Sequence, residues 1–193
     1  MRNLIAVALI LLAGSFSPAL AVDQSSPVEQ ADPAHKTSAR LDKLFADLKR
    51  ERNEKAAERI AGQIWEEWFK SGSASIDLMM MWAQNAINEQ KYDVALDFLD
   101  EVITLSPRYA EGWNRRATLH FIMSNYGKSM SDIDHTLSLE PRHFGALSGR
   151  VMIELTMGDR PAALKDMVAA LAIHPYLGMK QYFPELNRPV TNI

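Results

Sequence analysis

The sequence contains no cysteine, which excludes disulfide bonds, thiolate zinc sites and thiol nucleophiles. It has no apolar run of the length that crosses a bilayer, about 20 residues. The run from Leu4 to Ala13 has only ten, so a retained membrane anchor is the weaker interpretation of it. The formal net charge is −3, which gives no general attraction for nucleic acid or an anionic membrane surface.

Sequence motifs for catalysis are also missing. The five histidines form no His-x3-His pair with a glutamate, and the chain has no Gly-x-Ser-x-Gly turn, P-loop or dinucleotide fingerprint. Adjacent carboxylates such as Glu66 and Glu67 point in different directions on a helix. The run Met79 to Met81 diverges by about 100° per residue and cannot converge on one metal ion. We therefore expect a protein that is not an enzyme and that binds no cofactor or metal.

Proline recurs with a fixed period in the second half of the chain. Pro107, Pro141 and Pro175 are evenly spaced, and each closes a similar apolar phrase. A period of about 34 residues is typical of helix pairs that must stack on their neighbours to bury an apolar face. We therefore predict repeats over 76–109, 110–143 and 144–177.

The repeats carry small and large apolar residues at matching positions. The small residues are Ala95, Ser129 and Ala163. The large residues four positions later are Leu99, Ile133 and Met167. This pattern resembles the tetratricopeptide repeat (TPR), and the phrases that begin at Glu111 and Glu140 resemble small secreted TPR proteins of alphaproteobacteria. The resemblance implies an all-α fold, a right-handed TPR solenoid of about three regular helix-turn-helix repeats.

The same frame separates core from surface on the first helix of each repeat. It places Trp113 at the large apolar position of the central repeat, so we expect Trp113 in the core. Asn114, one residue further on, is expected to face the concave surface. His120 replaces a tyrosine of the pattern and is expected to be packed rather than bound to metal.

Two further segments complete the predicted TPR domain, 38–193. Apolar residues at helical spacing predict a degenerate N-terminal hairpin over 38–75. Its candidate small residue, Ala57, precedes Ala95 by more than one repeat period and is out of frame. After the last repeat, apolar residues over 178–193 predict a capping helix, interrupted near Pro184, because an open solenoid end needs a cover.

The first residues are expected to direct export. A short positive region, the apolar run and the small residues Ala19 and Ala21 predict a signal peptide over 1–21. The polar segment 22–37, with two prolines and no aromatic residue, predicts a disordered linker. We therefore expect a periplasmic protein that is not stably inserted in the membrane after cleavage.

Arg116 and Arg150 occupy a position where the TPR pattern has leucine, and they are one repeat period apart. A buried charge without a partner is strongly destabilising. We expect salt bridges to acidic residues such as Asp132, Glu140 or Glu154, although a functional role stays open.

In TPR proteins the first helix of each repeat lines the concave groove. The resemblance thus implies a peptide- or protein-binding groove in this chain, formed by Asp77, Gln84, Glu111, Asn114, Arg115, Thr118, Phe121, Ser148 and Met152. The set holds few of the lysines and asparagines that clamp a peptide carboxylate, so a carboxylate clamp is not expected. These side chains could also serve only to solvate a concave surface.

A second cluster lies where the last two repeats begin. Arg115, Arg142, His143 and Phe144 could form an arginine-aromatic anchor for a partner. The favoured alternative is a polar network between repeats that includes Glu111 and Glu140.

Two functional hypotheses follow. The favoured one is a non-catalytic interaction module or adaptor that binds a segment of a protein partner in its groove. The alternative is a structural or assembly subunit of an envelope complex or a homo-oligomer. Neither involves nucleic acid, and the sequence does not identify the partner or the process.

Overall fold

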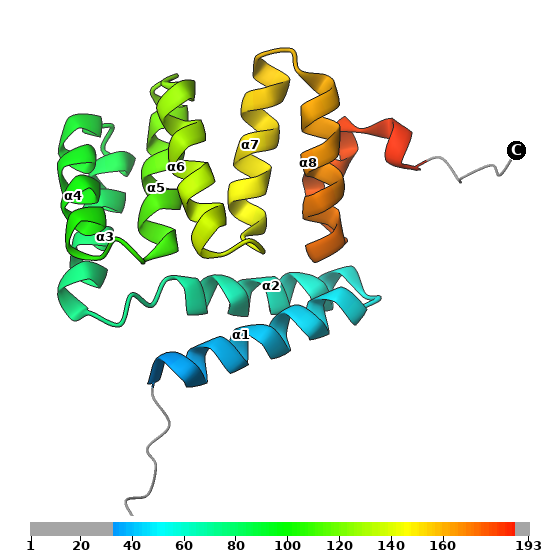
Figure 1. The fold of residues 1–193 in the computed structure, drawn as a ribbon, viewed down its shortest axis with the longest axis horizontal. Coiled ribbons are helices and arrows are strands. Elements are labelled where there is room, and N and C mark those ends of the chain that lie inside the picture. The colour runs from blue at the N-terminus through cyan, green and yellow to red at the C-terminus, as the bar shows by residue number, and fades with distance from the viewer. Residues whose placement is uncertain (1–32, 188–193) are drawn as a thin grey trace, which may run out of the picture. The chain divides into compact units, whose positions relative to one another are not determined.

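The computed structural model describes residues 33–187, which form antiparallel pairs of helices in chain order (Figure 1). The signal peptide expected over 1–21 and the linker up to residue 32 lie outside the described residues, as does 188–193. The helices are α1 (Pro33–Arg50), α2 (Glu54–Trp68), α3 (Ala74–Asn88), α4 (Tyr92–Leu105), α5 (Ala110–Ile122), α6 (Tyr126–Leu139), α7 (Phe144–Thr156) and α8 (Arg160–Ile173). Two short 3-10 helices follow, η1 (Gly178–Tyr182) and η2 (Pro184–Asn187).

The predicted repeats correspond to the pairs α3/α4, α5/α6 and α7/α8. The small residues Ala95, Ser129 and Ala163 are fully or almost fully buried, as are the large apolar residues four positions after each of them. Each second helix can approach its first helix closely because the contact residue is small. Ser129 illustrates this contact, since its hydroxyl donates a 2.7 Å hydrogen bond to the backbone oxygen of Ala117.

The same tight turn joins the two helices of every repeat. Gln90, Ser124 and Gly158, at equivalent positions of the three repeats, all adopt positive φ, at 59°, 59° and 81°. In each turn two backbone hydrogen bonds close the end of the first helix, for example from Lys91 N to Ala86 O at 2.8 Å. This is the Schellman arrangement, in which glycine is favoured at the left-handed position. Only the third repeat has glycine there.

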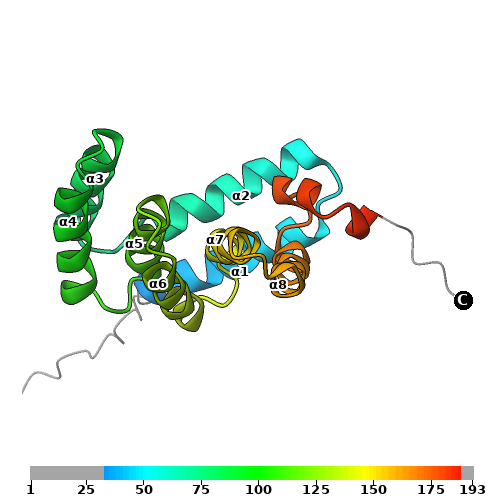
Figure 2. The same ribbon diagram turned by 90° about the horizontal axis from the view of Figure 1, so that it is seen from above.

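The N-terminal helices α1 and α2 form the predicted hairpin, but the hairpin does not stack ahead of α3. It lies across the ends of the other pairs, where the loops lead into α5 and α7 (Figures 1 and 2). Its apolar side packs on Phe144 and, at the end of α8, on Ile173 and Tyr176. The out-of-frame position of Ala57 is in keeping with a hairpin that does not continue the stack of repeats. In addition, α1 begins at Pro33, before the expected linker boundary at residue 37.

Aromatic contacts hold the hairpin in this position. The Trp68 ring stacks on the His143 ring with centroids 4.0 Å apart and an interplanar angle of 7°. Trp65 lies against Gly145, where a Cβ atom would come within 2.5 Å of the indole. The Tyr109 hydroxyl donates a 3.1 Å hydrogen bond to the backbone oxygen of Phe69. The hairpin therefore bridges the loops before the second and third repeats.

The chain after α8 covers the last repeat with η1 and η2, not with a single α-helix. The break between them falls at Phe183, directly before Pro184, near the predicted interruption. The Phe183 side chain is completely buried against Val151, Ala163 and Met167. Within residues 33–187, no helix has the length and apolar character needed to cross a membrane.

Candidate binding groove

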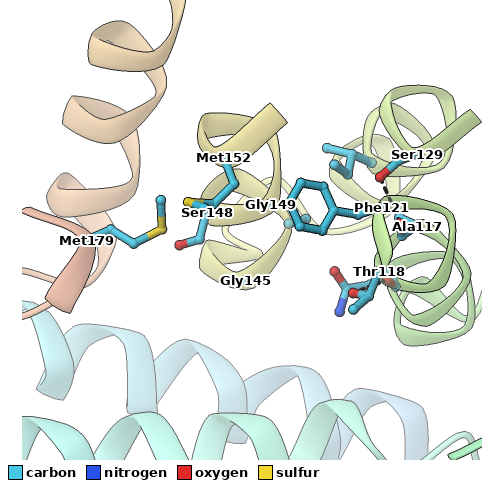
Figure 3. A pocket seen from close by; sticks show the side chains of 12 residues that line it. Ala117, Thr118, Phe121, Ser129, Gly145, Ser148, Gly149, Met152 and Met179 are labelled. Atoms are coloured by element: carbon cyan, nitrogen blue, oxygen red, sulfur yellow. Dashed lines mark hydrogen bonds between the residues drawn. The ribbon is translucent and has the colours of Figure 1, made fainter. Parts of the chain in front are cut away.

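A hollow of about 230 Å³ lies between the first helices of the second and third repeats (Figure 3). We call it the α5/α7 groove. It is lined by Asn114, Ala117, Thr118, Phe121, Ser129, Ile133, Gly145, Ala146, Ser148, Gly149, Met152 and Met179. None of these side chains is charged, so the groove suits an apolar, uncharged group.

Four elements position the groove side chains, with Ser129 and Ile133 contributed by α6. Phe121 projects from α5, with its ring 5.7 Å from that of Tyr126. Ser148 and Met152 come from α7, and Met179 reaches in from η1 (Figure 3). Small residues on the facing turns of α5 and α7 leave the space open between them. The groove thus has flexible thioether walls around a rigid ring, a combination that adapts to different apolar side chains.

Five of the predicted groove residues come together in this hollow. They are Asn114, Thr118, Phe121, Ser148 and Met152. Sequence reasoning missed Met179, because the TPR pattern assigns no groove role to the segment after the last repeat. The glycines Gly145 and Gly149, one helical turn apart, were the available signal for an open space on α7.

The other four predicted groove residues do not line the hollow. Asp77 accepts hydrogen bonds from the backbone and hydroxyl of Ser71, at 3.0 and 2.5 Å. Gln84 accepts a short hydrogen bond from Arg115. Glu111 is only 1% exposed. Glu111 is therefore buried away from the groove surface, whereas a binding role for the exposed Asp77 and the half-buried Gln84 and Arg115 stays a prediction.

Glu111 is the centre of a buried polar network. Its carboxylate accepts hydrogen bonds from Asn114 Nδ2 at 2.9 Å and from Arg115 Nη2 at 3.0 Å. His143 Nε2 lies 3.2 Å from the same carboxylate. The other ring nitrogen, Nδ1, accepts from the backbone N–H of Ala146 at 3.1 Å. His143 thus carries its proton on Nε2, and this N–H donates a hydrogen bond to the Glu111 carboxylate.

This network decides between the two interpretations of the arginine-aromatic cluster. Arg142 donates hydrogen bonds to Glu140 at 2.9 and 3.0 Å, and His143 binds Glu111. The Arg142 guanidinium also lies 4.3 Å from the centre of the Phe45 ring in α1. The predicted polar network with Glu111 and Glu140 is therefore confirmed. It crosses between repeats at Arg115 and Gln84, and it reaches the N-terminal hairpin through Arg142 and Asp42.

Arg116 and Arg150 form two equivalent sets of salt bridges, which we call the Arg–Asp ladder. Arg116 binds Asp132 of its own repeat and, at 2.6 Å, Asp100 of the preceding one. Arg150 likewise binds Asp166 and, at 3.1 Å, Asp134. The prediction of salt bridges is confirmed, with Asp132 among the partners. Glu140 and Glu154 are not partners of these arginines.

The hydrogen bonds to Asp132 raise the pKa of Arg116 above its usual value. A guanidinium with a raised pKa stays charged at every pH at which the protein is folded. Arg116 of α5 therefore acts as a permanent cation that joins Asp132 of α6 to Asp100 of α4.

Two buried polar atoms beside the ladder have no hydrogen-bond partner. They are Nδ1 of His120 and Oε2 of Glu154, at equivalent positions of successive repeats. Burial lowers the pKa of His120 and raises the pKa of Glu154, so each favours its neutral form. His120 is packed, as the pattern indicated.

The expected contrast between Trp113 and Asn114 is reversed. Trp113 is partly exposed; its indole N–H donates to the backbone oxygen of Pro107 at 2.9 Å, and its ring lies 3.8 Å from that of His135. Asn114 is 8% exposed and bonded to Glu111. Trp113 thus connects the loop at Pro107 to His135 of α6 and does not fill the core. Within the described part of the chain, no three histidine or acidic side chains gather as metal ligands would.

Helices in consecutive antiparallel pairs, a constant repeat period and the same turn in each pair define an all-α protein built of TPR-like helical repeats. The chain is a homologue of a TPR repeat-containing protein of Rhizobium etli, with which it shares 54% identity over 123 residues. The match covers 64% of this chain and 60% of the relative's length. No family model matches the sequence. The relative confirms the predicted resemblance to alphaproteobacterial TPR proteins.

Proposed function

We propose that the protein is a non-catalytic interaction module of the bacterial periplasm, which binds a segment of a partner protein in the α5/α7 groove. The observation that carries the proposal is the convergence of five predicted groove residues on one uncharged hollow. TPR repeats are built to present such surfaces between stacked first helices. The Rhizobium relative is named as a TPR repeat-containing protein, which supports the same class for this chain.

The size of the groove favours a side chain over a free metabolite. Its volume of about 230 Å³ lies below the roughly 300–1,000 Å³ of small-molecule pockets. One bulky apolar side chain of a partner would contact Phe121 on one side and Met152 and Met179 on the other. Such an anchor in a desolvated pocket supplies a large part of the affinity of many interfaces.

The polar groups at the mouth would orient the backbone of the bound segment. Thr118 is exposed on α5, and Ser148 lines the same hollow from α7. The Thr118 hydroxyl already donates to the backbone oxygen of Asn114 at 3.0 Å and can accept from a peptide N–H, while the Ser148 hydroxyl can donate or accept. Arg115, next to the groove residue Asn114 in the sequence, is bonded to Glu111 and Gln84. The groove thus favours an internal segment of a partner over a free C-terminal carboxylate.

Site-specific photo-crosslinking in the native cells tests this proposal. A photoreactive amino acid placed at Ser148 should give a discrete crosslinked partner, whereas the same group at the exposed Ala169 on α8 should not. Replacing Phe121 and Met152 together by alanine should remove the crosslink at Ser148 while circular dichroism keeps the helical signal. If Ser148 and Ala169 give the same products, or if the folded double variant keeps the product, the groove is not the binding site.

The periplasmic location is tested separately. Mass spectrometry of protein from the native cells should find an N-terminus at Val22, after the small residues of the expected cleavage site. An intact chain that begins at Met1 and stays in the membrane fraction would overturn this location.

A further inference from the structure

The first repeat differs from the other two at four equivalent positions. In repeat one these positions hold Trp82, Ala86, Val94 and Phe98, which we call the end face. In repeat two they hold Arg116, His120, Lys128 and Asp132, and in repeat three Arg150, Glu154, Ala162 and Asp166. The end face therefore has two aromatic rings where the other repeats have the Arg–Asp ladder.

In repeat two, a helix of the preceding repeat covers these positions. Leu96 and Asp100 of α4 lie over the site that Arg116 and His120 line. Repeat one has no such cover within the described residues, because the hairpin α1/α2 lies across the loops instead (Figures 1 and 2). The surface of α3/α4 that corresponds to a helix-receiving surface is therefore not covered by any part of residues 33–187.

The open face is apolar and hollowed. Trp82 and Val94 remain 43% and 44% exposed, and the Trp82 and Phe98 rings have centroids 5.5 Å apart. Together with Asn85, Ala86, Glu89 and Lys91 they surround a hollow of about 350 Å³. Terminal repeats of a solenoid normally present a polar outer surface to water. Here the polar residues are inside the stack and the aromatic residues are at its open end, a pattern typical of an interaction surface.

The charges around the end face indicate the chemistry of the occupant. Asp93, Asp97 and Glu101 are exposed along α4, one helical turn apart. The cation at the edge, Lys91, is paired with Glu89 at 2.7 Å. The surroundings are thus acidic, and two copies of this face would repel each other.

We propose that the end face binds an amphipathic helix of a partner protein, with an apolar stripe flanked by lysine or arginine. The helical form follows from repeats two and three, where a helix occupies the corresponding surface. The apolar stripe packs into the hollow between the Trp82 and Phe98 rings. The basic residues lie over Asp97 and Glu101 on α4. This site is separate from the α5/α7 groove and does not depend on its function.

Fluorescence anisotropy tests the proposal with a labelled synthetic helix of leucine and lysine, and with a matched helix of leucine and glutamate. The purified protein should bind the leucine-lysine helix about tenfold or more tightly than the leucine-glutamate helix. The decisive variant is Trp82→Arg plus Phe98→Asp, which installs the ion pair of the other repeats and leaves the net charge unchanged. This variant should lose about tenfold or more in affinity for the leucine-lysine helix.

Controls separate the end face from other effects. Phe121→Ala in the α5/α7 groove should leave this affinity unchanged, so that failure of one site does not imply failure of the other. Trp82→Ala serves as a second variant if the double change impairs folding, which circular dichroism would reveal. Unchanged binding by the folded variants, or equal binding of both helices, would overturn the proposal. A dimer of the wild-type protein that Trp82→Arg plus Phe98→Asp dissociates in light scattering would replace it by self-association.

Discussion

Asp132 accepts two parallel hydrogen bonds from the guanidinium of Arg116, at 2.8 and 2.7 Å, between the two helices of the central repeat. This fork-to-fork geometry is the strongest form of the arginine-carboxylate pair. The same pair recurs as Arg150 and Asp166. The ladder therefore gives the stack a repeated polar contact where most TPR repeats bury leucine.

Removing one member of this pair should be costly. Asp132→Ala leaves the Arg116 charge without its main partner, and we expect a loss of about 2–3 kcal/mol, below the value for a fully buried pair because Arg116 keeps contact with water. Asp100→Ala removes only an exposed partner and should cost less than about 1 kcal/mol. Urea unfolding of both variants measures the difference. Equal losses would show that the two acids support Arg116 equally.

The repeated turn offers a stabilising change. Gln90 and Ser124 adopt a left-handed conformation, which is energetically unfavourable for residues with a Cβ atom. Gln90→Gly and Ser124→Gly should each stabilise the protein by about 0.5–1 kcal/mol, after allowance for the greater freedom of glycine in the unfolded chain. Gly158→Ala, at the equivalent position, should destabilise it by a similar amount. Thermal unfolding checks all three, and stabilisation by Gly158→Ala would contradict the turn geometry.

The position of the N-terminal hairpin can be tested with two glycines on α7. A Cβ atom at Gly145 would come within 2.5 Å of the Trp65 indole, whereas one at Gly149 would lie 3.5 Å from Ile133 Cδ1. Gly145→Ala should therefore cost about 1–3 kcal/mol through overpacking. Gly149→Ala should be tolerated.

A double-variant cycle completes this test. In a Trp65→Ala background, Gly145→Ala should lose most of its effect, because the clashing ring is gone. Additive losses in urea unfolding would mean that Trp65 does not rest on Gly145.

Stability should fall on mild acidification because of His120. Burial lowers the pKa of His120 in the folded protein, while an unfolded histidine takes up its proton near pH 6.5. The stability that neutral, buried His120 contributes to the folded protein is therefore fully present above about pH 6.5. It is lost as the pH falls from about 6.5 towards the lower pKa of His120 in the folded state. His120→Phe should reduce the difference in unfolding free energy between pH 8 and pH 5. Parallel pH profiles of the variant and the wild type would exclude this role.

The repeat architecture could be predicted from the sequence because its determinants are local and periodic. Pro107 and its equivalents end the second helices, and small residues such as Ala95 allow each pair to close. Salt bridges for Arg116 could be predicted as well, since a charge at a packed position needs a partner. Five residues of the α5/α7 groove followed from the same frame, whereas four predicted residues do not line it and Met179 was missed.

Features that depend on contacts distant in sequence could not be predicted. The site of the α1/α2 hairpin is set by the stacking of Trp68 on His143 and by the space over Gly145, and no period in the sequence relates these residues. Trp113 was assigned to the core because the pattern fixes residue type and position. The pattern does not predict the hydrogen bond from Trp113 to the backbone oxygen of Pro107 or its contact with His135.

Arg142 donates a 2.6 Å hydrogen bond to Asp42, joining residues 100 positions apart. In a simple solenoid each repeat contacts only its neighbours, so that the terminal units can fray independently and the chain can be pulled apart one unit at a time. The hairpin joins the first described helices to the last two repeats. Contacts of such sequence separation slow folding, and they also mean that loosening one end loosens the other. The protein should therefore yield to heat or mechanical force as one cooperative body rather than by stepwise peeling.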